Sequence, residues 1–215
     1  MSGHDLAYHD RARVEVVPLL PRPCARILEL GCGTGATLAH LRSLGLAGWA
    51  AGVEASPAAA AIAAPRLDAL WPVDAQGWDP PLSPGSLDAI LCLDVLEHLP
   101  DPWAVVRRVT PLLRAGGALI ASLPNLRHYK VSLPLLLRGE FRYDPAGGIL
   151  DRTHLRFFVE STARELVAAG GLEVDSVVAL GIKPRTLKAA LLRASGGRLR
   201  GLVARQFLIR GTRRG

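Results

Sequence analysis

Cysteine is scarce in this sequence, and its spacing excludes the usual metal-binding patterns. The 215 residues include only Cys24, Cys32 and Cys92. No two of these stand close enough to form the paired ligands of a zinc site. An odd number of distant thiols also argues against a disulfide framework. We therefore predict no metal site, and we expect a reducing, cytoplasmic location.

The sequence also lacks a long apolar run. No stretch approaches the roughly 20 consecutive apolar residues that a membrane-spanning helix needs. The first ten residues include Asp5 and Asp10, which a secretory signal would not place there. Hydrophobic residues make up 49% of the chain and charged residues 21%, as in folded globular proteins. The length favours a single domain over residues 1–215.

Acidic residues are absent after Asp175, although the chain as a whole carries a net charge of +7. A basic segment of this kind can meet nucleic acid, anionic lipid or an anionic substrate. Its single aromatic residue is Phe207, too little for the stacking surface of a single-strand-binding groove. We expect a solvated basic face and no nucleic-acid partner. Peripheral contact with a membrane is a further alternative, because Leu187, Leu191 and Leu192 give the segment an apolar face.

One stretch, Arg26 to Leu38, has the pattern of a ligand-binding motif. Residues 27–30 are largely apolar, as in a buried parallel strand. Residues 36–44 predict a helix. The turn between them has glycine at alternate positions: Gly31, Gly33 and Gly35. Glycine lets the backbone turn sharply and lets a ligand approach closely, and the start of the helix offers unpaired N–H groups.

The glycine spacing alone leaves two ligand classes open. Gly31 and Gly33 with Ala36 satisfy a loose dinucleotide-binding pattern. Glu29 would place a like charge beside a pyrophosphate, whereas it would attract an amine or a sulfonium. Gly35 extends the pattern to three alternating glycines. These two details favour a cationic ligand over a nicotinamide dinucleotide.

With its acid and three glycines, the segment Glu29-Leu-Gly-Cys-Gly-Thr-Gly35 resembles the first motif of the class I S-adenosylmethionine (SAM)-dependent methyltransferases. The resemblance covers about residues 8–180. It implies an α/β fold, a Rossmann-like seven-stranded sheet of order 3-2-1-4-5-7-6 with the last strand antiparallel. It also implies a cap inserted after strand five.

Strands and helices can be placed along this frame from the apolar patterns. Ser56-Pro57 has the residues of a helix start, and Pro72 predicts an irregular third strand. We expect Gly116-Gly117 to end the fourth helix. The predicted strands are 27–30, 48–53, 70–74, 87–93, 118–123, 172–180 and 206–209. The predicted helices are a short one around 16–20, then 36–44, 58–64, 103–113, 133–137 and 161–169, with two short basic ones in 182–204.

An acid at the end of the second strand can accept both ribose hydroxyls of a nucleoside, and Glu54 stands there. Other contacts follow from the resemblance: Asp74-Ala75 would meet adenine, and Asp94-Val95 would flank the methionine end. The 1–25 segment would form a lid through Tyr8 and Arg13, although it could equally cover only core. The predicted cofactor-binding residues are Glu29, Gly31, Cys32, Gly33, Gly35, Glu54, Ala55, Asp74, Ala75, Asp94, Val95, Tyr8 and Arg13.

Residues 124–158 interrupt the alternation of strands and helices and are predicted to form a substrate cap. Two of their segments, Leu-Pro-Asn-x-Arg-His-Tyr and Leu-Asp-Arg-Thr-His-Leu-Arg-Phe-Phe, resemble a bacterial methyltransferase subgroup associated with glycan biosynthesis. His154 could take a proton from a hydroxyl and Asp151 could orient it, or both could merely pin the cap. The predicted substrate-binding residues are Asn125, Arg127, His128, Tyr129 and Arg152, of which the arginines suit an anionic group. His98 could be a base or a structural residue.

We therefore expect SAM-dependent methyl transfer to a small-molecule or glycan acceptor. O-methylation of a sugar in a nucleotide-linked or lipid-linked glycan is the favoured reaction, by resemblance. The alternatives are a nicotinamide-dependent oxidoreductase, an RNA or protein methyltransferase guided by the basic segment, and a non-catalytic SAM-binding scaffold. Val159 replaces the capping Thr or Ser usual in the subgroup, so we expect Ser161 to cap the following helix.

Overall fold

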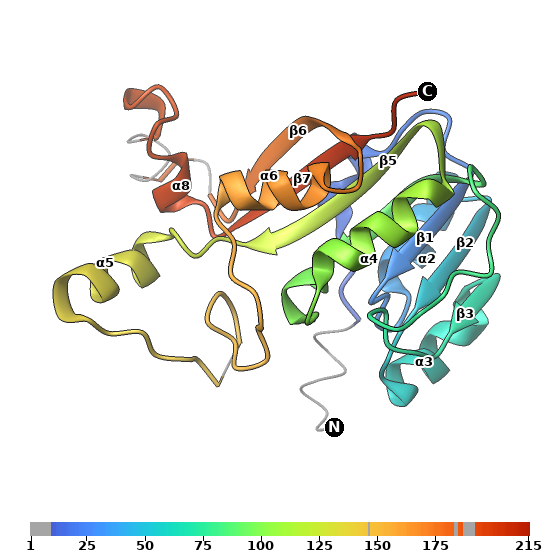
Figure 1. The fold of residues 1–215 in the computed structure, drawn as a ribbon, viewed down its shortest axis with the longest axis horizontal. Coiled ribbons are helices and arrows are strands. Elements are labelled where there is room, and N and C mark those ends of the chain that lie inside the picture. Colours follow the sequence, from blue (N-terminus) through green and yellow to red (C-terminus); the bar gives the residue numbers. More distant parts are fainter. Residues whose placement is uncertain (1–9, 146, 183–184, 187–191) are drawn as a thin grey trace.

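The chain forms one seven-stranded sheet with the order β3-β2-β1-β4-β5-β7-β6, shown in Figure 1. The structure is a computed structural model that describes residues 10–145, 147–182, 185–186 and 192–215. The strand order is the predicted one. The strands are β1 Arg26–Leu30, β2 Trp49–Val53, β3 Ala69–Trp71, β4 Leu87–Leu93, β5 Leu113–Pro124, β6 Glu173–Leu180 and β7 Gln206–Thr212.

Strands β1 to β5 pair in parallel, and β7 pairs antiparallel with both β5 and β6. The antiparallel last strand is confirmed. In the parallel part, all strands end at one edge of the sheet, so the loops after β1, β2, β4 and β5 gather there. Such an edge is where open α/β sheets bind ligands.

Helices cover both faces of the sheet. The first layer comprises η1 Val14–Leu19, α2 Ala36–Ser43 and α3 Pro57–Ala63, and the second comprises α4 Pro102–Val109 and α6 Glu160–Ala168. The α3 helix begins as predicted, because Ser56 caps it and Pro57 occupies its first turn. The shorter elements are η2 Ala64–Arg66, η3 Leu96–His98, η4 Thr110–Leu112, α5 Tyr129–Arg138 and α8 Arg200–Val203.

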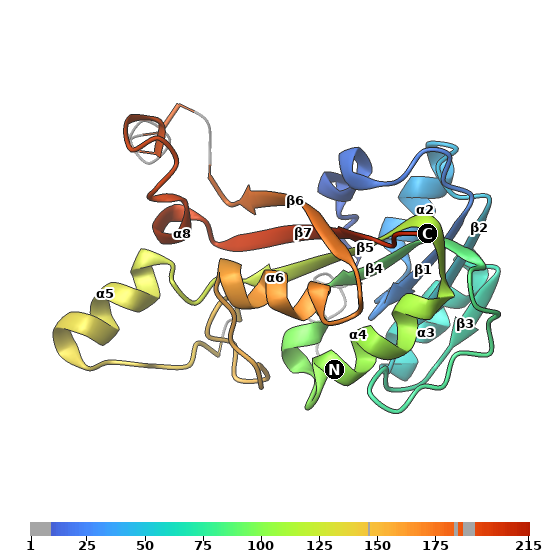
Figure 2. The same cartoon turned by 45° about the horizontal axis from the view of Figure 1, so that its top comes forward.

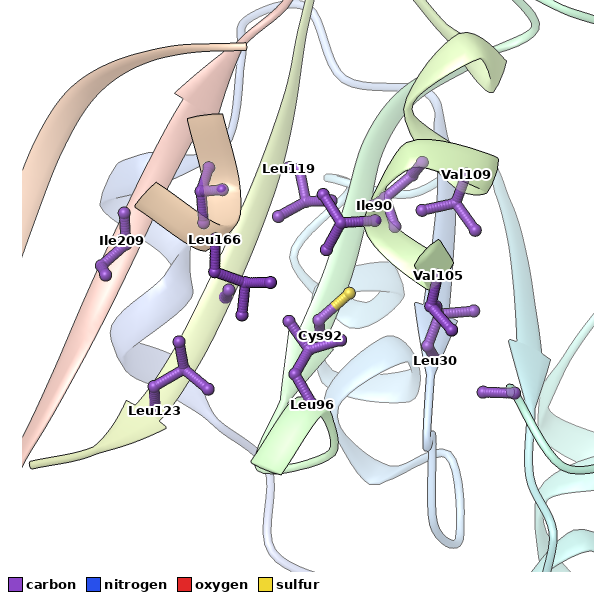
Figure 3. Close-up of a cluster of buried hydrophobic side chains, with 14 of the residues drawn as sticks. Leu30, Ile90, Cys92, Leu96, Val105, Val109, Leu119, Leu123, Leu166 and Ile209 are labelled. Carbon is purple, nitrogen blue, oxygen red and sulfur yellow. The ribbon is translucent and has the colours of Figure 1, made fainter. Parts of the chain in front are cut away.

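The core follows the alternation of side chains along each strand. In β4, Ile90 and Cys92 pack with α4 and α6, whereas Ala89 and Leu91 pack with α2 and η1 on the other face. Figure 3 shows the first of these clusters, in which Leu166 of α6 lies against the sheet. Strands buried on both faces explain the nearly continuous apolar runs in the sequence.

Strand β3 is short, as Pro72 predicted: it ends at Trp71 rather than at residue 74, because proline cannot donate to the ladder. Two local predictions were wrong. Gly116-Gly117 lies within β5 rather than ending a helix. A Cβ on Gly117 would lie 2.9 Å from the Arg114 carbonyl, so the bulged backbone there needs glycine. The start of α6 is also capped differently, by the Thr162 hydroxyl, which accepts the Val159 N–H at 3.0 Å.

The segment after β5 extends away from the sheet. Helix α5 stands apart from the body at the same end as α8, as Figures 1 and 2 show. Leu136 and Leu137 on α5 are largely exposed. Two apolar residues of the predicted basic helices, Leu187 and Leu191, lie outside the described residues. Within the described residues, no helix is long and apolar enough to span a membrane.

Candidate functional site

The glycine turn between β1 and α2 has a backbone that favours glycine at each predicted position. Gly31, Gly33 and Gly35 have φ values of 66°, 55° and 76°, which are costly for residues with a Cβ. A Cβ on Gly31 would lie 2.9 Å from Cγ2 of Val95. The turn therefore packs directly against the loop after β4. Gly31 and Cys32 donate their N–H groups to the carbonyl of Val53 at 2.8 and 3.1 Å.

Glu29 lies buried beneath this turn. Its side chain is hydrogen-bonded to Thr37, but its Oε2 atom has no hydrogen-bond partner among the described residues. Burial raises the pKa of the Glu29 carboxyl to about 8, and the charge of Glu54 adds to the effect, although Arg13 opposes it. A buried acid without a full set of partners is costly, and it suits a cationic ligand group at this point.

The buried carboxylate of Glu54 connects two loops at the end of β2. Its Oε2 accepts the N–H of Gly33 and its Oε1 accepts the N–H of Ser56, both at 2.8 Å. Each oxygen keeps a further lone pair for a ligand hydroxyl. Ala55 beside it is exposed.

Asp74 follows β3 by three residues and is exposed. Its Oδ1 accepts the N–H of Gln76 at 2.8 Å, whereas the neighbouring Ala75 is buried. The register here was uncertain from the sequence because of Pro72. The structure leaves Asp74 in the loop after the shortened strand.

The N-terminal segment reaches over the carboxyl edge of the sheet. Arg13 forms an ion pair with Asp94 and donates to Ser122 Oγ at 3.1 Å and to Gln206 Oε1 at 3.2 Å. Asp94 has a left-handed backbone with a φ of 56°, a strained geometry that clusters at functional sites. Tyr8, the other predicted lid residue, lies outside the described residues.

A buried acid and two histidines meet beside this edge. Glu97 and His154 are buried, and Nε2 of His154 lies 4.0 Å from Oε1 of Glu97. The ring of His98 contacts that of His154, with 4.8 Å between their centres. Neither carboxyl oxygen of Glu97 has a hydrogen-bond partner in the described part of the chain. Burial and the charge of Asp94 raise the pKa of Glu97 well above its usual range.

Each of the two imidazoles forms a hydrogen bond between its Nδ1 atom and a backbone carbonyl. Nδ1 of His98 lies 3.2 Å from the Thr153 carbonyl, and Nδ1 of His154 lies 3.0 Å from the Ile149 carbonyl. Burial and the neighbouring His154 lower the pKa of His98. The predicted orienting residue, Asp151, accepts instead from Thr153 N–H and Oγ at 2.8 and 2.7 Å. The carboxyl group that faces His154 is that of Glu97, which no sequence pattern marks as a site residue.

The five predicted substrate residues are not all in one place. Asn125 is buried and donates through Nδ2 to the carbonyls of Gly201 and Ala204, both at 2.7 Å, so it fixes the chain ahead of β7. His128 caps α5, its Nδ1 accepting the Lys130 N–H at 3.3 Å. Its ring contacts that of Tyr129. Arg127 and Arg152 are exposed.

The sequence matches the methyltransferase domain family over residues 5–177. The chain belongs to this family. It is 34% identical over 110 residues to the ubiquinone biosynthesis O-methyltransferase of Xanthomonas campestris pv. campestris, an alignment that covers 48% of this chain and 44% of that protein. The chain thus spans about half the length of the curated relatives it matches.

Solved structures agree with the fold. A SAM-dependent methyltransferase from Methanosarcina mazei superposes with a TM-score of 0.65 at 18% identity, covering 95% of this chain and 99% of that one. Phosphoethanolamine N-methyltransferase 2 from Haemonchus contortus, in complex with SAM, superposes with a TM-score of 0.62 at 13% identity, covering 94% and 52%. The chain thus has the fold of the class I SAM-dependent methyltransferases, and SAM is the cofactor that this family implies.

The residues at the carboxyl edge fit this cofactor. Glu29 offers a buried carboxyl oxygen with no hydrogen-bond partner among the described residues, which suits the ammonium or sulfonium of SAM. The turn at Gly31 leaves no room for a Cβ beside Val95, so glycine lets this turn pack directly against the loop after β4 at the same edge. Glu54 stands at the end of the neighbouring strand with lone pairs free for the ribose.

Proposed function

We propose that this methyltransferase methylates a hydroxyl oxygen of a small-molecule acceptor, and that the acceptor is a sugar of a nucleotide-linked or lipid-linked glycan. The observation that carries the proposal is the pair of contacting imidazoles, His98 and His154, at the carboxyl edge of the sheet. A sugar hydroxyl is a weak nucleophile and needs a base as it attacks. The name of the Xanthomonas relative supports oxygen as the acceptor atom.

SAM supplies an electrophilic methyl group when bound. The chain's part is then to align the partners and to accept one proton. Glu29 and Arg13 would hold the charged ends of the methionine moiety, and Glu54 would hold the ribose. Asp74, with the backbone at Ala75, would hold the adenine.

His98 is the member of the imidazole pair that can face an acceptor. It is half-buried, whereas His154 is buried. With Nδ1 donating to the Thr153 carbonyl, Nε2 of His98 carries the lone pair. Its lowered pKa keeps that nitrogen unprotonated at neutral pH. His154 and Glu97 would position His98, and the turn at Asp151 would fix the cap segment that carries His154.

The basic C-terminal segment is poorly suited to bind nucleic acid, because many of its arginines already form ion pairs or hydrogen bonds within the protein. Arg200 pairs with Glu160, Arg210 with Asp175 and Arg214 with Glu173. Arg213 donates to two backbone carbonyls. These contacts favour a small-molecule acceptor over RNA.

A second acceptor class is a ring hydroxyl of a lipid-linked aromatic compound, as the name of the Xanthomonas relative suggests. The long cap with its exposed leucines on α5 is compatible with either class. Both acceptor classes should therefore be tested as substrates in the same activity assay.

The test is release of S-adenosylhomocysteine from SAM with a panel of nucleotide sugars, prenyl-linked sugars and catechols, followed by mass spectrometry of the product. We expect a gain of one methyl on oxygen. His98→Asn should lower kcat about a hundredfold or more and remove the acid limb of the pH profile. His40→Asn on α2 is the control. Turnover on nitrogen only, or a kcat unchanged in His98→Asn, would overturn the proposal.

A further inference from the structure

A cavity of about 640 Å³ lies between the end of β5, the first turn of α6 and the segment leading into α8. This volume is within the range of small-molecule sites. Figures 1 and 2 place α8 near the start of α6, beyond the end of β5. The cavity does not include the glycine turn of the cofactor motif.

Four arginines line this cavity, against a single acid. They are Arg127, Arg164, Arg198 and Arg200, and the acid is Glu160. Glu160 is already shared, since it accepts from Arg164 at 3.2 Å and also pairs with Arg200. Arg127 and Arg198 have no acidic partner in the described part of the chain. The cavity therefore holds a clear excess of positive charge.

The wall of the cavity is fixed by buried hydrogen bonds. Asn125 is fully buried and holds the carbonyls of Gly201 and Ala204. Gly201 leaves room for Arg127, because a Cβ there would lie 3.1 Å from Nη1 of that guanidinium. Three chain segments far apart in sequence thus bring their guanidinium groups to one place. Guanidinium groups bind phosphate oxygens through paired N–H donors.

We propose that this cavity binds the phosphate or diphosphate group of the methyl acceptor; its assignment to the acceptor rests on the proposed function. The excess of guanidinium groups matches a ligand with two or more negative charges. The cavity begins at Asn125, directly after β5, and so adjoins the edge at which Asp94 and His98 lie. An acceptor anchored here by its phosphate can extend its sugar toward that edge.

The test is calorimetric titration of the full-length protein, saturated with S-adenosylhomocysteine, with inorganic pyrophosphate. We expect binding in the wild type. Arg127→Gln and Arg198→Gln should each weaken it about tenfold or more, while leaving S-adenosylhomocysteine affinity unchanged. Glu160→Gln should strengthen it, because two guanidiniums are released. Arg107→Gln, which removes an exposed arginine on α4 away from the cavity, should have no effect.

Two further ligands separate the sources of the phosphate. Tighter binding of uridine diphosphate than of pyrophosphate would point to a nucleotide-linked acceptor, and tighter binding of geranyl diphosphate to a lipid-linked one. Absence of pyrophosphate binding, or equal binding in Arg127→Gln, Arg198→Gln and Arg107→Gln, would overturn the proposal. Because no methyl transfer is measured, that result would leave O-methylation untouched. Conversely, the loss of O-methylation with intact pyrophosphate binding would leave the anion site standing.

Discussion

Cofactor binding should be coupled to the protonation of Glu29. Burial raises the pKa of this carboxyl to about 8, and its Oε2 has no hydrogen-bond partner in the described part of the chain. With that pKa, about nine-tenths of the free enzyme carries a proton on Glu29 at pH 7. A cationic group of the cofactor would favour the ionised carboxylate. Binding at pH 7 should then release about 0.9 proton.

The same linkage fixes the pH dependence of affinity. Affinity should rise about tenfold per pH unit below pH 8 and level off above it, on the order of a hundredfold between pH 6 and pH 9. The folding stability of the free protein should change with pH in the opposite sense, falling where the affinity rises. A carboxyl whose pKa is raised in the folded state contributes stability at low pH, and this contribution is lost as pH rises from about 4.5 toward 8.

The assay is isothermal titration calorimetry with SAM in two buffers that differ in ionisation enthalpy, from which the number of protons released is obtained. Glu29→Gln keeps the shape of the side chain but cannot titrate. The variant should bind SAM more weakly at pH 8 and release almost no proton at pH 7. Titration with S-adenosylhomocysteine, which keeps the ammonium but lacks the sulfonium, identifies the cation involved. No proton release in the wild type, or equal release in Glu29→Gln, would refute this account.

Three further outcomes are expected. Gly31→Ala should lower stability by about 1–3 kcal/mol in chemical denaturation and weaken S-adenosylhomocysteine binding, because its Cβ meets Val95. Gly85→Ala, with a φ of 70° and no atom within 4 Å of its Cβ, should cost less and spare binding; equal effects would contradict the steric argument. Leu166→Ala should cost about 2–5 kcal/mol without changing cofactor affinity; a change below 1 kcal/mol would mean the core relaxes around the site. Chelation with EDTA should leave turnover unchanged, because burial raises the pKa of Glu97 and so weakens its carboxyl as a metal ligand. Activity lost to EDTA and restored by a divalent cation would instead make Glu97 and its neighbouring histidines, which lie within 4.8 Å, a metal site.

The local sequence was sufficient to place the residues around the glycine turn. Strand, glycine turn and helix follow one another without a break, so Glu29 and the glycines are placed by short-range geometry. Glu54 follows from the rule that the next parallel strand ends at the same edge. The strand order and the antiparallel last strand followed from the resemblance to a known fold, and both are confirmed.

Tertiary structure decided the rest. Asn125 looks like a substrate residue in the sequence, but its amide is used to hold the chain before β7. Glu97 has the pattern of an ordinary helix acid in the sequence, but the fold buries it with His154 of the segment after β5 against it.

The arginine cavity shows the same limit most clearly. Arg127, Arg164 and Arg198 belong to three separate segments, and each looks like a solvated surface charge in the sequence. Only the packing of α6 and of the segment before α8 against the end of β5 brings them together. Sequence patterns report the geometry of neighbours along the chain, whereas the burial and the electrostatics of a site depend on residues that only the folded chain makes neighbours.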